Sequence, residues 1–259
     1  MSEILFQRSA SGIATITLNR PRRKNAVTAA MWDELRRLFQ EVSQNASDRV
    51  LVITGAGDAF CAGADLADAT ASGNRAHPLH AMIPVNAAAL ALHEVSKPTL
   101  AKVNGDAVGA GMNLALGCDL VVASESARFS EIFARRGLSL DFGGSWLLPR
   151  LVGMHKAKEL ALFGEILSAR EAESVGLVNR VVPNAELDAF VADWAERLAS
   201  GAPLALQLSK KLLSNAFSMG LSEALDAEAA AQSVNLVSED TREGVAAFLE
   251  KRKPVFRGR

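Results

Sequence analysis

Two segments rich in glycine and alanine carry the chemistry that this sequence suggests. The first is Phe60-Cys-Ala-Gly-Ala-Asp-Leu66 and the second is Asn104-Gly-Asp-Ala-Val-Gly-Ala-Gly-Met-Asn113. Each follows an apolar run typical of a β-strand, Val50–Thr54 and Thr99–Val103. Their small side chains let backbone N–H groups face a ligand. Two such donors that converge on one point form an oxyanion hole, which stabilises negative charge on a carbonyl oxygen.

The hydrophobic pattern indicates which elements position these segments. Strands alternate with helices up to about residue 183, and only helices are expected afterwards. We therefore expect an α/β core over residues 1–195 and a C-terminal helical region over residues 196–259, whose apolar faces must pack against the core or other subunits. The expected strands are a hairpin over 4–18 and runs at 50–54, 99–103, 119–123, 128–132 and 177–182. The expected helices are 28–42, 86–95, 110–116, 143–152 and 156–163, with Thr28 as an N-cap, a capping box at Ser168-Ala-Arg-Glu171 and a loop over 66–82.

Composition and charge exclude several classes of protein. The chain has 259 residues, of which 49% are hydrophobic, and its formal net charge is −1. A nucleic-acid partner would usually require a basic surplus, so we expect none. The first twenty residues lack a continuous apolar core, and no run approaches the ~18 apolar residues that span a membrane. We therefore expect no signal peptide, no membrane partner and a cytoplasmic location.

Motifs for metals, disulfides and nucleotides are not met. Cys61 and Cys118 have no second Cys or His at ligand spacing, so we expect no disulfide and no metal site. Gly55-Ala-Gly57 follows a strand, but Phe60 stands where a dinucleotide fingerprint needs its third glycine. The oxyanion-hole interpretation is therefore the one that remains.

Taken in order along the chain, the motifs resemble those of the crotonase superfamily, the enoyl-CoA hydratase/isomerase family. The resemblance covers nearly the whole sequence, from Asn19-Arg-Pro through both glycine-rich segments to Glu243-Gly-Val-Ala-Ala-Phe-Leu-Glu-Lys251. It implies a spiral of repeated ββα turns with a C-terminal helical trimerisation region, and a homotrimer or a dimer of trimers. It also implies an acyl-CoA thioester as substrate, with coenzyme A as part of that substrate and no tightly bound cofactor.

The resemblance also implies roles for individual residues. The thioester carbonyl would accept hydrogen bonds from the backbone N–H groups of Ala62 and Ala110, and Ala110 also opens a helix, where an anion is favoured. Phe248 and Lys251 match family positions that reach coenzyme A, often across a subunit boundary, although Phe248 is equally well interpreted as a helix core residue. The other residues expected along coenzyme A are Arg22, Arg23, Lys24, Ala64, Asp65 and Leu66.

The sequence departs from the hydratase pattern at the acid–base positions. A hydratase of this family uses two glutamates, and these positions hold Asn113 and Phe133. Asp141 matches the aspartate of family isomerases, and the same position carries the nucleophile of aryl-CoA dehalogenases. Its alternative interpretation is an ordinary N-cap. Glu131 and Asp106 are off the family's catalytic positions, and we interpret both as structural. The residues expected to form the substrate pocket with Asp141 are Asn113, Phe133, Leu138, Leu140, Phe142 and Trp146.

Several functions are compatible with this pattern. Our leading hypothesis is double-bond isomerisation, which needs a single carboxylate to take a proton and return it elsewhere while an oxyanion hole stabilises the enolate. Burial in an apolar pocket would raise the pKa of Asp141 and make it a better base. The alternatives are enoyl-CoA hydration with Asp141 alone, hydrolase or dehalogenase chemistry through a covalent intermediate at Asp141, and a non-catalytic acyl-CoA-binding homologue.

Overall fold

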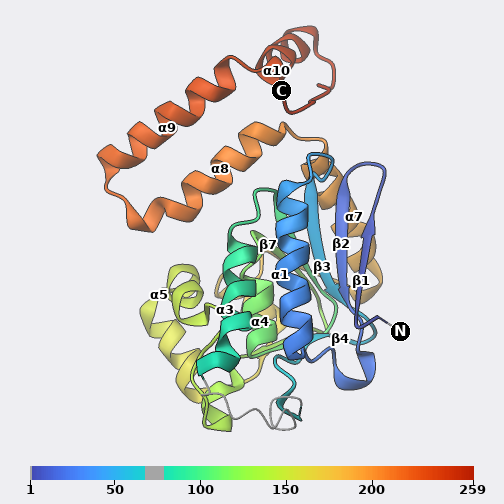
Figure 1. The fold of residues 1–259 in the computed structure, drawn as a ribbon, viewed down its shortest axis with the longest axis vertical. Coiled ribbons are helices and arrows are strands. Elements are labelled where there is room, and N and C mark those ends of the chain that lie inside the picture. Colours follow the sequence, from blue (N-terminus) through green and yellow to red (C-terminus); the bar gives the residue numbers. More distant parts are fainter. Residues whose placement is uncertain (1, 68–78) are drawn as a thin grey trace.

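Two β-sheets and the helices around them make up the body of the molecule (Figure 1), which a computed structural model describes over residues 2–67 and 79–259. The strands are β1 (Ile4–Arg8), β2 (Ile13–Leu18), β3 (Val50–Gly55), β4 (Ala59–Cys61), β5 (Thr99–Val103), β6 (Asp106–Val108), β7 (Leu120–Ser124), β8 (Arg128–Ser130), β9 (Leu167–Ser168) and β10 (Arg180–Val182).

The α-helices and short 3₁₀ helices follow or connect these strands. The α-helices are α1 (Ala29–Gln44), α3 (Leu79–His93), α4 (Ala110–Leu116), α5 (Gly144–Phe163), α6 (Ala169–Ser174), α7 (Leu187–Ala199), α8 (Pro203–Asn215), α9 (Leu221–Leu236) and α10 (Glu239–Glu250). The 3₁₀ helices are η1 (Pro21–Arg23), η2 (Ile132–Arg136), η3 (Asn184–Glu186) and η4 (Ala216–Ser218).

Successive strand pairs divide between the two sheets in a regular way. The larger sheet has the order β1-β2-β3-β5-β7-β10 and the smaller one β4-β6-β8-β9. In each of the pairs β3/β4, β5/β6 and β7/β8, the first strand joins the larger sheet and the second joins the smaller one, and a helix follows each pair. Both sheets are parallel apart from β1/β2 and β8/β9. The structure therefore confirms the predicted α/β spiral of ββα turns.

The larger sheet is buried on both faces, which explains its apolar central strands. Every residue of β3 is buried. Leu51 and Ile53 pack into a core that includes Leu35 and Phe39 of α1, whereas Val52 on the opposite face packs with Val191 of α7. A strand covered by helices on both sides has no polar face, so an uninterrupted apolar run is expected there.

Most predicted elements are confirmed, with differences at their ends. Thr28 caps α1 by accepting a hydrogen bond from the backbone N–H of Met31 at 3.3 Å, and the capping box at Ser168 and Glu171 is present. The predicted helices over 143–152 and 156–163 correspond to α5, whose backbone breaks at Gly153 (φ 76°, ψ 164°). Helix α3 begins at Leu79 rather than at residue 86, and residues 68–78 of the expected loop lie outside the described residues.

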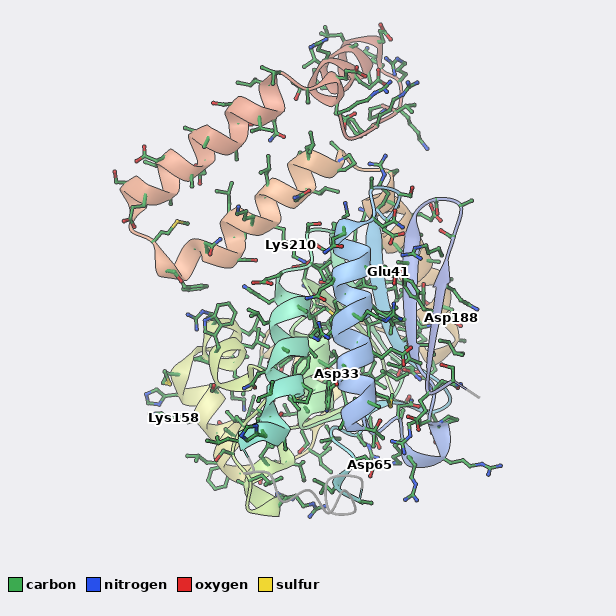
Figure 2. The ribbon with its side chains drawn as sticks, in the orientation of Figure 1. Asp33, Glu41, Asp65, Lys158, Asp188 and Lys210 are labelled. Carbon is green, nitrogen blue, oxygen red and sulfur yellow. The ribbon has the colours of Figure 1, made fainter. Side chains whose placement is uncertain are left out.

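The C-terminal helices extend away from the sheets. In Figure 1, α8, α9 and α10 lie above the body. Lys210, labelled in Figure 2, anchors α8 to the body. Its Nζ lies 2.7 Å from Asp119 Oδ2 and donates to the Lys97 carbonyl at 3.0 Å. Large apolar side chains remain exposed on this part, among them Leu213, Phe217, Leu221, Leu236, Phe248 and Leu249. None of the described helices is long and apolar enough to cross a membrane.

Candidate active site

The two glycine-rich segments cross each other in close contact. A Cβ added at Gly111 would lie 2.8 Å from the Cβ of Cys61, and one added at Gly63 would lie 3.4 Å from the backbone N of Ala110. Real Cβ atoms essentially never approach a neighbour to less than 3.0 Å, so Gly111 is required for this crossing. The predicted convergence of the two segments is therefore present in the structure.

A cavity of about 330 Å³ opens where the two segments meet. Its wall comes from four stretches of the chain: the turn after η1, the segment after β4, the β6–α4 connection, and η2 with the residues that precede α5. Its lining includes Lys24, Ala62, Ala64, Leu66, Asp106, Ala110, Phe133, Arg136, Leu138 and Asp141.

The structure corrects one of the two predicted oxyanion-hole donors. The N–H of Ala62 donates to the Lys24 carbonyl at 2.9 Å, so it is not available to a substrate. Ala64 lies two residues further on, between Gly63, whose carbonyl accepts from Val27, and Asp65, whose N–H donates to the Val27 carbonyl. In an extended segment the intervening residue directs its own N–H to the other side. Over residues 2–67 and 79–259, the N–H of Ala64 has no hydrogen-bond partner.

The N–H of Ala110 is likewise open to the cavity. It belongs to the first turn of α4, where backbone N–H groups have no acceptor within the helix. Gly109 before it has φ 56° and gives its own N–H to the Ser130 carbonyl at 2.8 Å. Within the described part of the chain, no acceptor pairs with the Ala110 N–H. The free donors at the crossing are thus those of Ala64 and Ala110.

The turn after η1 holds the first segment in place. Lys24 and Asn25 both adopt positive φ, 48° and 57°. Asn25 is fully buried, and its amide donates to the carbonyls of Ala56 and Ala59 at 2.9 and 2.8 Å. This anchor positions the Lys24 carbonyl against Ala62. Arg23 is exposed and does not line the cavity.

Two carboxylates near the cavity are already neutralised by cations. The Asp65 carboxylate lies 2.9 Å from Arg20 Nη1, which fixes the segment that carries Ala64 and Leu66. Asp106 lies 2.8 Å from both Lys24 Nζ and Arg128 Nε, and these partners lower its pKa, chiefly through the Arg128 hydrogen bond. The expectation that Asp106 is structural agrees with these contacts.

Asp141 is the cavity carboxyl without such a partner. No ion pair reaches it from the described residues, and its Oδ1 is buried without a hydrogen bond. Burial raises its pKa from 3.8 to about 6. The N-cap of α5 is Gly143, and no side chain caps that helix. The alternative interpretation of Asp141 as an N-cap is therefore wrong, and Asp141 can act as a base near neutral pH.

Asn113 lies behind the cavity rather than in its wall. It is fully buried, and its Nδ2 donates to the Asp141 carbonyl at 3.0 Å and to Glu131 Oε2 at 3.4 Å. A Cβ at Gly144 would lie 2.8 Å from Asn113 Cγ, so the amide is held closely on that side. Glu131 is 1% exposed, and burial raises its pKa to about 8, with a further increase from Asp141. Glu131, which the sequence indicated to be structural, does not line the cavity, but its buried carboxyl accepts a hydrogen bond from the Asn113 amide.

Phe142 and Trp146 do not line the cavity with Asp141, contrary to our expectation. They line a second cavity of about 390 Å³ between α3 and α5, together with Leu90 and His93. The reason is the backbone, since Phe142 has φ 46° and Gly143 has φ 82°. This left-handed turn directs the Phe142 side chain away from the side that Asp141 faces, and its ring packs on Trp32 with 5.1 Å between centroids.

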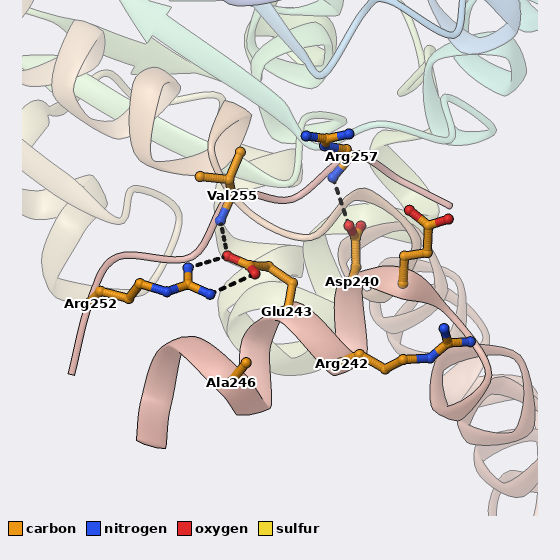
Figure 3. A pocket seen from close by; sticks show the side chains of 8 residues that line it. Asp240, Arg242, Glu243, Ala246, Arg252, Val255 and Arg257 are labelled. Carbon is orange, nitrogen blue, oxygen red and sulfur yellow. Dashed lines mark hydrogen bonds and ion pairs between the residues drawn. The ribbon is translucent and has the colours of Figure 1, made fainter. Parts of the chain in front are cut away.

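The C-terminal positions lie apart from the cavity within one chain. Phe248 is 83% exposed and Lys251 is the C-cap of α10, at the end of the molecule above α8 and α9 (Figure 1). A cavity of about 610 Å³ also lies there (Figure 3). Its carboxylates are occupied: Glu243 accepts from Arg252 and from the Val255 N–H at 2.8 Å, and Asp240 accepts from the Arg257 N–H at 2.6 Å. These contacts fasten the C-terminal tail to α10.

Among residues 2–67 and 79–259, no three His, Cys, Asp or Glu side chains gather in a way that could hold a metal ion. Burial raises the pKa of the Cys61 thiol to about 12, so Cys61 under the cavity is not a thiolate nucleophile at neutral pH. Among the described residues, the groups at this cavity that can stabilise an enolate or move a proton include the free backbone donors and the carboxyls.

Comparisons with known proteins show which family the chain belongs to. The profile of the Enoyl-CoA hydratase/isomerase family matches residues 8–259. A probable enoyl-CoA hydratase of Rhodobacter capsulatus is 43% identical over 96% of each chain, and the 1,2-epoxyphenylacetyl-CoA isomerase of Escherichia coli is 38% identical over the full length of both. The crystal structure of an enoyl-CoA hydratase from Bacillus anthracis superposes with a TM-score of 0.95 at 35% identity, covering all of both chains. The chain therefore belongs to the enoyl-CoA hydratase/isomerase family.

Proposed function

We propose that this enzyme isomerises a double bond in an acyl-CoA thioester, with Asp141 as the proton shuttle. The observation that carries the proposal is the placement of one unpaired carboxyl, Asp141, in the same cavity as the free N–H groups of Ala64 and Ala110. The positions that hold glutamates in a hydratase hold the buried amide of Asn113 and the phenyl ring of Phe133. Neither can transfer a proton at neutral pH.

The proposed reaction moves one proton and no other group. The thioester carbonyl accepts hydrogen bonds from Ala64 and Ala110. The ionised Asp141 takes a proton from the carbon next to one end of the double bond, and the electron pair of that C–H bond moves into the enolate. The carboxyl then returns its proton to a different carbon as the double bond re-forms. Each backbone donor is worth about 3 kcal/mol of transition-state stabilisation in such sites.

The rest of the cavity suits the remainder of an acyl-CoA. Arg136 brings positive charge to the wall, and the cluster of Lys24 and Arg128 around Asp106 keeps one net positive charge. Ala64 and Leu66 provide small and apolar surface. Cations favour the phosphates of coenzyme A. Phe248 and Lys251 would reach coenzyme A from another copy of the chain, since they are remote from the cavity of their own. The exposed apolar side chains of α8–α10 support this assembly, and a trimer or a dimer of trimers stays our prediction.

The test is Asp141→Asn, assayed on 3-enoyl-CoA and 2-enoyl-CoA thioesters with α-proton exchange followed in heavy water. We expect kcat for isomerisation and exchange to fall by about 10²- to 10⁴-fold, because general-base catalysis is lost, while thioester affinity is retained. Asp193→Asn, at an exposed carboxylate of α7, is the matched control. Undiminished turnover in Asp141→Asn would remove this residue from the mechanism.

Hydration is the competing function, because the Rhodobacter capsulatus relative bears a hydratase name. Crotonyl-CoA hydration and isomerisation should be measured on one preparation. The proposal requires isomerisation to be the faster reaction. Faster hydration, abolished by Asp141→Asn, would instead mean that Asp141 activates water. Tight binding of thioesters without turnover or proton exchange would mean that the chain binds acyl-CoA without catalysis.

A further inference from the structure

Glu131 is a buried carboxyl that the mechanism above does not use. Its side chain is 1% exposed, and no Lys, Arg or His among the described residues forms an ion pair with it. Its Oε1 is buried without any hydrogen bond. An ionised carboxylate in such surroundings would be strongly destabilising, because neither water nor a cation compensates its charge.

The Asn113 amide beside Glu131 also has a buried oxygen without a hydrogen-bond partner. The Asp141 carbonyl can only accept a hydrogen bond, so the nitrogen end of the Asn113 amide must face it, at 3.0 Å. The second hydrogen of Nδ2 points to Glu131 Oε2 at 3.4 Å. Asn113 Oδ1 is thereby left buried without a donor. Two adjacent side chains thus each carry a buried oxygen that lacks a hydrogen bond.

A single proton on Glu131 Oε1 would give both of these oxygens a hydrogen-bond partner. We propose that Glu131 is a neutral carboxylic acid that pairs with the Asn113 amide through two hydrogen bonds, and that this pair positions Asp141. Glu131 Oε1–H donates to Asn113 Oδ1, and Asn113 Nδ2 donates to Glu131 Oε2. The other hydrogen of Nδ2 then holds the Asp141 carbonyl. Glu131 is a positioning residue here, and the inference rests on the proposed function only in taking Asp141 as the base.

The surroundings of Glu131 favour the neutral acid. From α4 it meets the uncharged Asn113, and the segment before α5 brings Asp141, whose negative charge favours protonation of Glu131. On η2, Arg135 gives its guanidinium Nε–H to the Phe163 carbonyl at 2.8 Å, and Arg136 lines the cavity. The raised pKa of Glu131, about 8, agrees with this assignment.

The first test uses kinetics. Glu131→Leu removes both hydrogen bonds at similar volume and should lower kcat by about 10- to 100-fold, with KM little changed, since the base is misplaced rather than the thioester site. Glu131→Gln can form the same two hydrogen bonds without ionising and should recover most of that loss. The exposed Glu165→Gln is the control. If Glu131→Gln were as impaired as Glu131→Leu, an ionised Glu131 would be required and the proposal would be wrong.

The acidic limb of the pH–rate profile gives a second readout. A neutral Glu131 does not contribute charge while Asp141 titrates, so Glu131→Gln should leave the limb near pH 6 in place and abolish any loss of activity near pH 8. A shift of the acidic limb to lower pH in Glu131→Gln would mean that a negative charge had been removed, and would overturn the proposal.

A third readout does not depend on activity. Glu131 binds its proton more tightly in the folded protein than in the unfolded chain, so its contribution to stability is complete below about pH 4 and is lost as pH rises towards 8. The unfolding constant of the wild type should therefore rise about tenfold per pH unit, relative to that of Glu131→Gln, between pH 5 and 7.5. Parallel curves would refute the neutral acid even if the enzyme were not an isomerase, whereas failure of Asp141→Asn to affect turnover would refute only the proposed function.

Discussion

The two walls of the cavity are built on different principles. The wall formed by the segments after β4 and β6 presents backbone N–H groups, and most of its residues are alanine or glycine. The wall formed by η2 and the residues before α5 presents side chains, with Asp141 at the surface and the buried pair of Glu131 and Asn113 behind it. The first wall depends on the path of the chain, and the second depends on which residue stands at each position.

This difference separates what the family shares from what a member does. A backbone N–H is present in every residue except proline, so the first wall keeps its function when Ala110 replaces a glycine. The second wall changes its chemistry with a single substitution, because a carboxyl, an amide and a phenyl ring differ in whether they can carry a proton. Under the proposed function, the reaction type is decided at Asn113, Phe133 and Asp141, whereas the backbone donors of Ala64 and Ala110 serve any reaction that forms an enolate.

Apart from the loss of Asp141 itself, the largest effect is expected from removing one backbone donor of the other wall. Ala110 is the first residue of α4, a position at which proline fits the helix and merely lacks the N–H. We expect Ala110→Pro to lower kcat by about 10²- to 10³-fold, the usual loss for one oxyanion-hole donor. Ala110→Gly keeps the N–H and should stay within about threefold of the wild type. Equal losses in both variants would show that the side chain, not the N–H, matters at this wall.

The second expected effect is a dependence on pH that arises from the side-chain wall. Asp141 must be ionised to take a proton, and its pKa is about 6. The rate constant kcat/KM should therefore fall about tenfold per pH unit below pH 6. Stability should change in the opposite direction, because the folded state binds the Asp141 proton more tightly than the unfolded chain: it decreases as pH rises from about 4 to 6. An acidic limb near pH 4 would mean that Asp141 is solvated or is not the base.

The two walls also differ in how far sequence could predict them. Strands β3 and β5 and helix α4 could be predicted because apolar runs and small residues mark them locally. Choosing between Ala62 and Ala64 could not, because the choice depends on hydrogen bonds to Lys24 and Val27, which lie more than thirty residues away along the chain. The short strands β4 and β6 could not be predicted either, because three residues are too few to show a periodic pattern.

In the side-chain wall, the sequence around Glu131 contains a signal for burial, whereas local sequence does not predict the turn at Phe142. Glu131 lies two residues after Phe129, so in the strand predicted over 128–132 it shares the buried face of Phe129. That spacing favours a buried carboxyl over a surface one. The separation of Phe142 from Asp141, in contrast, follows from positive φ at two consecutive residues. Phenylalanine rarely adopts such a conformation, and nothing in its neighbours predicts it.

A smaller effect should follow from adding a methyl group next to the buried pair of Glu131 and Asn113. A Cβ at Gly144 would overlap the Asn113 amide, with Cγ at 2.8 Å. We expect Gly144→Ala to destabilise the protein by about 1–3 kcal/mol, as overpacking does, and to lower kcat several-fold because Asn113 no longer holds Asp141 well. Alanine favours a helix over glycine by about 1 kcal/mol, so a stabilised variant with full activity would contradict this packing. Thermal unfolding and kinetics of Gly144→Ala and of the neighbouring exposed Ser145→Ala provide the measurement.

The smallest effect on catalysis is expected at Trp146, on the other side of the turn at Phe142. The Arg150 guanidinium lies over the Trp146 ring, with Cζ 4.0 Å from the ring centroid. The His93 ring packs against the same indole, with 5.1 Å between centroids. Trp146→Leu should cost about 1 kcal/mol of stability through the lost cation–π contact and leave the acidic limb of the pH–rate profile where it was. Phe133→Ala in the cavity should move that limb to lower pH, because water then reaches Asp141 and favours its ionised form. The two variants together locate the substrate: if Trp146→Leu moved the limb and Phe133→Ala did not, the reaction would take place in the cavity between α3 and α5.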